Sequence, residues 1–181
     1  MIAEQAKAAM DFFGQRGSRF EQAVDRICSQ LKEGKKVIVF GNGGSAAQAQ
    51  HFASELVNKF LKKRRAIAAL SLTTDTSSLT SIANDFDFDH VFSRQIEALG
   101  QAGDVALALS TSGESMNVIR ALQTAREKDL YTVGLTGEGG GRLGSLCHIL
   151  LDVPSKETPR VQEVHLLLLH LLAQEIEEIA G

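Results

Sequence analysis

The chain has 181 residues, with 19 Lys and Arg against 22 Asp and Glu and a formal net charge of −3 at pH 7. This length suits one compact domain, and we expect a single domain over 1–181. The charge argues against nucleic-acid binding through a basic field, and no apolar run approaches the roughly 20 residues of a membrane span. Two cysteines, Cys28 and Cys147, make no disulfide framework. With no signal pattern at the N-terminus, we expect a cytoplasmic protein.

Residues 1–35 are predicted to form two amphipathic helices that serve in oligomerisation. Apolar residues recur at helical spacing over 1–16, and Gly17 interrupts the pattern. Ser18, with Glu21 three residues on, then forms a capping-box pattern that begins a second helix, which ends at Gly34.

From residue 36 to 181, short apolar runs alternate with helical segments, which indicates a parallel sheet covered on both faces. The fold class we predict is a three-layer α/β/α arrangement with five parallel strands. The predicted strands are 37–40, 66–72, 104–110, 131–136 and 148–153. The predicted helices are 45–60, 76–84, 90–99, 115–128 and 160–179, with a short turn at 142–146.

The last predicted helix, 160–179, has almost no polar face in its middle, where residues 165–172 are HLLLLHLL. A helix that is apolar all round is buried on all sides. We therefore expect a homo-oligomer built on helix packing, with this helix in its core.

The first strand, 37–40, ends at Gly41-Asn42-Gly43-Gly44-Ser45, and a helix follows. Glycines let backbone N–H groups crowd around an anion at the positive end of the helix, so phosphate is the expected ligand. The turn lacks the ending of a Walker A loop and the spacing of a dinucleotide fingerprint. An ordinary strand-to-helix turn is the alternative.

A second turn of this kind, Ser110-Thr111-Ser112-Gly113-Glu114-Ser115, follows strand 104–110. Its hydroxyl groups can donate to a phosphate alongside backbone N–H groups, although simple helix capping also explains them. Both turns lie at carboxyl ends of parallel strands, the edge where open α/β sheets bind ligands. Together they favour a phosphorylated small molecule.

Polar side chains near these turns are candidates for chemistry. His51 and Glu55 share one helix face at i, i+4 spacing, as an ordinary surface pair also would. His170 lies among leucines, and a buried histidine without a partner is costly, so it is either a satisfied core residue or a site residue. Asn84 and Asp85 either close the pocket or cap a loop.

Five segments together resemble the sugar-isomerase (SIS) domain family, and within it the phosphoheptose isomerases, over nearly the whole chain. They are FGNGGSAAQAQHFASEL (40–56), SIANDF (81–86), STSGESMNVI (110–119), GLTGEGGG (134–141) and RVQEVHLLLLH (160–170). The resemblance implies a flavodoxin-like fold and conversion of sedoheptulose 7-phosphate to D-glycero-D-manno-heptose 7-phosphate. That reaction is the first step in the synthesis of ADP- or GDP-heptose precursors for lipopolysaccharide cores or related glycans. It also implies a homotetramer with sites at subunit interfaces, often with bound zinc.

The resemblance also implies roles for individual residues. The catalytic residues would be Glu55 as base and His170 as acid, and Zn²⁺ ligands would be drawn from His51, Glu55, Gln162 and His170. The residues expected to contact the substrate are Asn42, Gly43, Gly44, Ser45, Glu55, Asn84, Asp85, Ser110, Thr111, Ser112, Ser115 and Gln162.

The chemistry of a ketose-to-aldose conversion suits these residue types. A carboxylate can move the proton between C1 and C2, a histidine can move protons at oxygen, and a divalent ion can polarise the carbonyl. Glu55 would be a weaker base if it also bound metal. Gln162 and His170 are eight residues apart, about 12 Å along a helix, so either neighbouring subunits complete the metal site or the ion uses only some of the four.

A non-catalytic relative of the same fold, which binds the bacterial replication initiator, is the alternative function. That protein lacks acidic and imidazole groups at the positions that match Glu55 and His170. Both groups are present here, which favours the enzyme.

Overall fold

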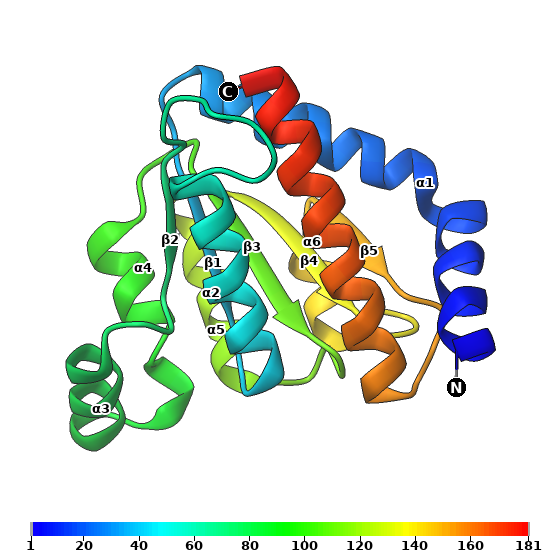
Figure 1. Ribbon diagram of the computed structural model, residues 1–181. Coiled ribbons are helices and arrows are strands. Elements are labelled where there is room, and N and C mark those ends of the chain that lie inside the picture. The colour runs from blue at the N-terminus through cyan, green and yellow to red at the C-terminus, as the bar shows by residue number, and fades with distance from the viewer. Residues whose placement is uncertain (1, 181) are drawn as a thin grey trace.

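The computed structural model describes residues 2–180 and the side chains of residues 3–179, so the two ends of the predicted 1–181 domain lie outside the described residues. Its centre is a parallel sheet in the order β2-β1-β3-β4-β5 (Figure 1). The strands are β1 Val37–Gly41, β2 Ala69–Ser71, β3 Val105–Ser110, β4 Tyr131–Thr136 and β5 Ile149–Asp152. The predicted three-layer α/β/α fold with five parallel strands is confirmed.

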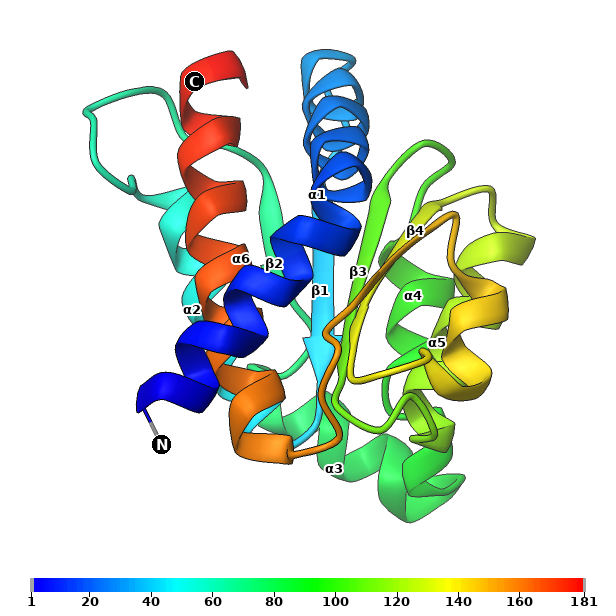
Figure 2. The ribbon, with the colours of Figure 1, turned by 90° about the vertical axis from the view of Figure 1, so that its right-hand side faces the viewer.

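Helices cover both faces of the sheet, as Figure 2 shows. The α-helices are α1 Ile2–Lys32, α2 Gly44–Val57, α3 Thr76–Asp85, α4 Ser93–Leu99, α5 Met116–Glu127 and α6 Thr158–Ala180, and the 3₁₀ helices are η1 Phe88–His90 and η2 Gly141–Leu146. One face carries α1, α2 and α6, and the other carries α4 and α5. Within the described part of the chain, no helix combines the length and the apolar character that crossing a membrane requires.

Side chains of each central strand divide between two apolar clusters. In β1, Val37 and Val39 pack with α1, α2 and α6, while Ile38 and Phe40 pack with α4 and α5. Successive side chains of a strand point to opposite faces, so a sheet covered on both sides buries all of them. This is why β1 has a continuous apolar sequence.

The N-terminal region forms one helix, α1, and the prediction of two helices divided at Gly17 is wrong. Ser18 lies inside α1 and begins no second helix. The helix bends near its middle (Figures 1 and 2), as glycine-containing helices do, without losing its helical assignment. Packing holds it there: the Phe12 side chain is fully buried, and Arg16 Nε lies 2.7 Å from Asp152 Oδ1 on β5.

Helix α6 is buried largely by its own chain, since it packs against α1, α2 and the sheet. Leu168 in the leucine run is fully buried within the chain, whereas its neighbour Leu167 is 38% exposed. The apolar composition of α6 is therefore explained mainly by intrachain packing, and it does not by itself require an oligomer.

His165 is a fully buried histidine whose Nε2 lies 3.1 Å from the Thr136 carbonyl oxygen on β4. Its Nδ1 has no hydrogen-bond partner among the described residues. Burial lowers the pKa of His165 to about 4, against a smaller raising effect of the bond to Thr136. The imidazole is therefore neutral in the folded protein, with Nε2 donating.

We predict that His165 makes the folded state sensitive to acid between pH 6.5 and pH 4. The unfolded chain gains a proton on this imidazole as pH falls below 6.5, while the folded chain stays neutral until about pH 4, so folding stability is lost on acidification. Across this window of about 2.5 pH units, at about 1.4 kcal/mol per unit, the loss is about 3 kcal/mol.

Urea unfolding of the wild type and His165→Leu at a series of pH values measures this loss. The unfolding free energy of the wild type minus that of His165→Leu should fall by about 3 kcal/mol between pH 6.5 and pH 4. A difference that stays constant from pH 6.5 to pH 4 would contradict the assignment.

Candidate active site

The two predicted turns lie side by side at the centre of the sheet. Strands β1 and β3 are neighbours, but α2, which follows β1, and α5, which follows β3, cover opposite faces. A crevice opens where the connections diverge in this way, which makes it the usual ligand site of such sheets. A cavity of about 70 Å³ lies here, lined by Asn42, Ser45, Leu109, Ser110, Thr111, Ser115 and Gln162.

A reciprocal pair of amide hydrogen bonds joins the two turns. Asn42 Nδ2 donates to Asn117 Oδ1, and Asn117 Nδ2 donates to Asn42 Oδ1, both at 2.8 Å. Asn117 is buried in the first turn of α5. The pair fixes the distance between the turns, and sequence reasoning missed Asn117 because its partner is 75 residues away.

Two glycines of the first turn, Gly43 and Gly44, are needed for different physical reasons. Gly43 has a φ of 55°, a conformation that residues with a side chain rarely adopt. At Gly44, a Cβ would lie 2.7 Å from Gln162 Nε2, so the missing side chain lets α6 approach the start of α2. Gln48 Nε2 donates to the Gln162 carbonyl at 2.8 Å and strengthens this contact.

Both helices begin without a side-chain cap. The N-cap positions are Gly43 for α2 and Ser115 for α5, and neither makes a side-chain cap hydrogen bond. The Ser110 hydroxyl accepts from Gly113 N at 3.2 Å and donates to Ser115 Oγ at 3.4 Å. Helix capping therefore does not account for Ser115, and the uncapped N–H groups suit an anion.

Two other residues of the second turn have structural roles. The Ser112 hydroxyl lies outside the cavity lining and accepts the backbone N–H of Glu114 at 3.1 Å. Gly113 has a φ of 69°, and a Cβ there would lie 2.2 Å from the carbonyl oxygen of Gly140. The turn is thus packed directly against the glycine segment that precedes η2.

The structure brings His51, Glu55 and His170 together within one chain. The two Nε2 atoms of His51 and His170 are 2.9 Å apart, and His51 Nε2 is 3.6 Å from Glu55 Oε1. The imidazole rings meet edge to face, with centroids 5.2 Å apart. Phe60, from the loop after α2, stacks on the His170 ring at 5.7 Å and 27°. His170 is half-buried beside polar partners, so it is not a core histidine.

The four predicted zinc ligands are not assembled in one place. Gln162 contacts Gly44 at the first turn, whereas His51 and His170 meet farther along α2 and α6. In residues 2–180, no group of three or more His, Cys, Asp or Glu side chains is arranged to hold a metal ion. Within one chain, the candidate ligands that lie together are the Nε2 atoms of His51 and His170, with Glu55 Oε1 3.6 Å from His51 Nε2.

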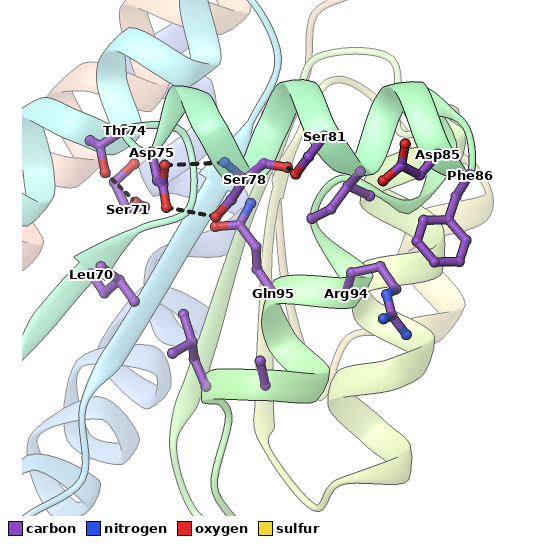
Figure 3. Close-up of a pocket in the computed structure, with 13 residues that line it drawn as sticks. Leu70, Ser71, Thr74, Asp75, Ser78, Ser81, Asp85, Phe86, Arg94 and Gln95 are labelled. Atoms are coloured by element: carbon purple, nitrogen blue, oxygen red, sulfur yellow. Dashed lines mark hydrogen bonds between the residues drawn. The ribbon is translucent and has the colours of Figure 1, made fainter.

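Asn84 and Asp85 lie at the end of α3, where Asn84 Nδ2 donates to Asp85 Oδ1 at 2.8 Å. Asp85 lines a second, larger cavity of about 510 Å³ between α3, α4 and β2 (Figure 3). Phe86 and Arg94 flank it there, with the Arg94 guanidinium 4.8 Å from the Phe86 ring centroid. Within one chain, this pair therefore lies outside the cavity between the two turns.

Comparison with known proteins identifies the family. The model of the SIS domain matches residues 3–137. A phosphoheptose isomerase from Desulfovibrio desulfuricans is 52% identical over 169 residues, covering 93% of this chain and 80% of the relative. The chain belongs to the phosphoheptose isomerases of the SIS domain family.

Solved structures of phosphoheptose isomerases share the whole fold of this family member. The protein from Neisseria gonorrhoeae aligns with a TM-score of 0.93 at 42% identity, covering 98% of this chain and 95% of the other. The protein from Francisella tularensis aligns with a TM-score of 0.94 at 34% identity, covering 98% and 94%. The similarity includes the two turns and the long C-terminal helix, so the chain is an isomerase of this type.

We predict that two glycine substitutions in the turns have different consequences. Gly113→Ala should lower the unfolding free energy by roughly 1–3 kcal/mol, because the residue has a positive φ and its new methyl group would overlap backbone. Gly44→Ala should cost less, because only the end of the flexible Gln162 side chain has to move.

Urea unfolding and substrate KM measure the two effects. We expect Gly44→Ala to raise KM while it leaves most of the stability intact. Equal stability losses for the two variants would contradict this account of the turns.

Proposed function

We propose that Glu55 and His170 catalyse the interconversion of sedoheptulose 7-phosphate and D-glycero-D-manno-heptose 7-phosphate. The observation that carries the proposal is the meeting of His51, Glu55 and His170 on α2 and α6, two helices that also contribute Ser45 and Gln162 to the cavity between the two phosphate-type turns. Membership of the phosphoheptose isomerases supplies the substrate. The product would feed heptose precursor synthesis for lipopolysaccharide cores or related glycans.

The reaction transfers protons between carbon and oxygen, with no net oxidation. Glu55 removes a proton from C1 of the ketose while His170 gives a proton to O2, which yields an enediol. The protonated Glu55 then delivers its proton to C2, and His170 takes the proton of the C1 hydroxyl, which leaves the aldehyde. Each group returns to its starting state, as an acid–base pair of carboxylate and imidazole can.

In this proposal, the phosphate lies against the second turn. Ser110, Thr111 and Ser115 line the cavity, and the uncapped start of α5 favours negative charge there. Ser112, on the exposed side of the turn, would reach the phosphate through a modest movement. Asn42, Gly43, Gly44, Ser45 and Gln162, which meet at the first turn, would contact the sugar.

Zinc, where it is bound, would be held by His51 and His170. Their Nε2 atoms are 2.9 Å apart, and imidazole nitrogens and carboxylate oxygens are ligands that zinc accepts in proteins. The ion would supply polarisation of the substrate carbonyl in place of the proton from His170, because a coordinated imidazole nitrogen carries no proton to donate. Glu55 would serve in proton transfer and not as a ligand, because a coordinated carboxylate is a weaker base. Gln162 would reach the ion only if α6 moved.

We further propose a cytoplasmic homotetramer, with the N-terminal helix at its interfaces. Met10 and Phe13, three residues apart on α1, leave 74% and 37% of their apolar side chains exposed in the single chain. Such exposure is typical of interaction surfaces. In the tetramer, Asn84 and Asp85 would complete the site of a neighbouring chain. The two free cysteines suit a reducing compartment.

The alternative function, binding of the replication initiator by a non-catalytic SIS protein, receives no support from the relatives found. Glu55 and His170, which such a protein lacks, are both present and lie beside His51.

Glu55→Gln tests the proposed base. Replacing a carboxylate with its neutral isostere should lower kcat by about 10²–10⁴-fold, the usual contribution of a general base, while sedimentation still shows the tetramer. The assay follows the aldoheptose phosphate by NMR after addition of sedoheptulose 7-phosphate. Glu127→Gln, an exposed carboxylate at the far end of α5, is the matched control and should behave as the wild type.

Wild-type turnover in Glu55→Gln would refute the role of Glu55 as base, and an inactive wild type would refute the function itself. Repeating the assay with a chelator tests whether zinc takes part in the reaction: kcat should fall on chelation and recover when zinc is added. An unchanged kcat in the metal-free protein would remove zinc from the proposal.

A further inference from the structure

A buried carboxylate near the end of α6 organises the loop that follows α2. Glu177 is 6% exposed and accepts three consecutive backbone N–H groups, from Phe60 at 2.9 Å and from Leu61 and Lys62 at 2.8 Å. Burial raises the pKa of Glu177, but these three donors and Arg64 together lower it below its ordinary value. The carboxylate is therefore charged and fully engaged with the loop.

Arg64 connects the same carboxylate to the last turn of α2. Its Nε lies 3.2 Å from Glu177 Oε1 in a buried ion pair that is not aligned as a hydrogen bond. Its Nη2 donates to the Glu55 carbonyl at 2.7 Å, and its Nη1 donates to the Leu56 carbonyl at 2.8 Å. One guanidinium thus holds the backbone of Glu55 against α6.

The loop leads back to the catalytic histidine. It arches from the end of α2 toward the C-terminal part of α6 (Figure 1), and Phe60 within it stacks on the His170 ring. Glu177 and His170 are seven residues apart on α6, about two turns, so they lie on the same face of the helix. Glu177, which fixes the loop, and His170, which the loop covers, therefore lie on the same face of α6.

We propose that Glu177 and Arg64 form a positioning pair that keeps the proposed base and acid in their relative places. Glu177 sets the loop so that Phe60 supports the His170 ring, and Arg64 holds the last turn of α2, which carries Glu55. Neither residue touches the substrate in this account. The effect of this pair on catalysis rests on the proposed roles of Glu55 and His170. The effect of Glu177 on the position of Phe60 does not depend on those roles.

The kinetic test compares Glu177→Gln with Glu178→Gln. Glu178 is the next residue of α6, and its exposed side chain pairs with Lys62, so the control removes the same charge from the same helical turn. For Glu177→Gln we expect kcat to fall about tenfold, with KM within about twofold, because a misplaced catalytic group slows the chemical step more than it weakens binding. Glu178→Gln should match the wild type.

A second readout needs no enzymatic activity. The chain has no tryptophan, so Phe60→Trp introduces a single tryptophan at the stacking position, which excitation at long wavelength distinguishes from Tyr131. In this background, Glu177→Gln should shift the tryptophan emission to longer wavelength and increase its quenching by acrylamide, whereas Glu178→Gln should change neither. Unchanged emission in the Glu177→Gln protein would overturn the proposal.

Phe60→Leu provides a test in case Glu177→Gln fails to fold. It leaves the Glu177–Arg64 pair intact and removes only the ring that contacts His170, so kcat should fall while the melting temperature changes little. Wild-type kcat in Phe60→Leu would overturn the proposal, as would a Glu177→Gln variant whose loss of activity only follows its loss of folded protein. If the wild type does not isomerise sedoheptulose 7-phosphate, the proposed function fails, and the fluorescence still decides whether Glu177 controls Phe60.

Discussion

The packing of α6 along α2 is the contact on which the site depends. Polar contacts join the two helices at successive levels: Gln48 with the Gln162 carbonyl, His51 with His170, and the carbonyls of Glu55 and Leu56 with Glu177 through Arg64. The partners follow one another in the same order along both helices, so α2 and α6 run side by side in the same direction (Figure 1). The proposed base, Glu55, is thereby held on the helix that faces the proposed acid, His170.

Apolar packing alone would only loosely determine how far α2 is shifted along its axis relative to α6. The surrounding side chains, including Phe52 on α2 and Leu169 and Leu172 on α6, are aliphatic or aromatic and fully or almost fully buried. Buried polar groups need specific partners, because an unpaired one costs about 1–3 kcal/mol. The Glu177 carboxylate has four such partners, which only one register satisfies. The same contacts that stabilise the helix pair therefore also fix the relative positions of the two proposed catalytic residues.

Local patterns predicted the sheet and the two turns well. Buried parallel strands have continuous apolar sequences, and glycine and hydroxyl residues at their carboxyl ends are typical of turns that bind anions. Local patterns failed where distant packing decides. Gly17 was predicted to divide two helices, yet burial of Phe12 and the Arg16–Asp152 pair hold α1 as one. Asn117 and Glu177 gave no signal because their partners are far away in the sequence, and Asp85 lies at a different cavity within the single chain.

A crystal structure of Glu55→Gln with sedoheptulose 7-phosphate would test the central claim most directly. The account predicts the phosphate within hydrogen-bonding distance of Ser110, Thr111 and Ser115, and C1 and C2 of the sugar between residue 55 and His170. A phosphate bound elsewhere, or a sugar chain that reaches neither side chain, would contradict it.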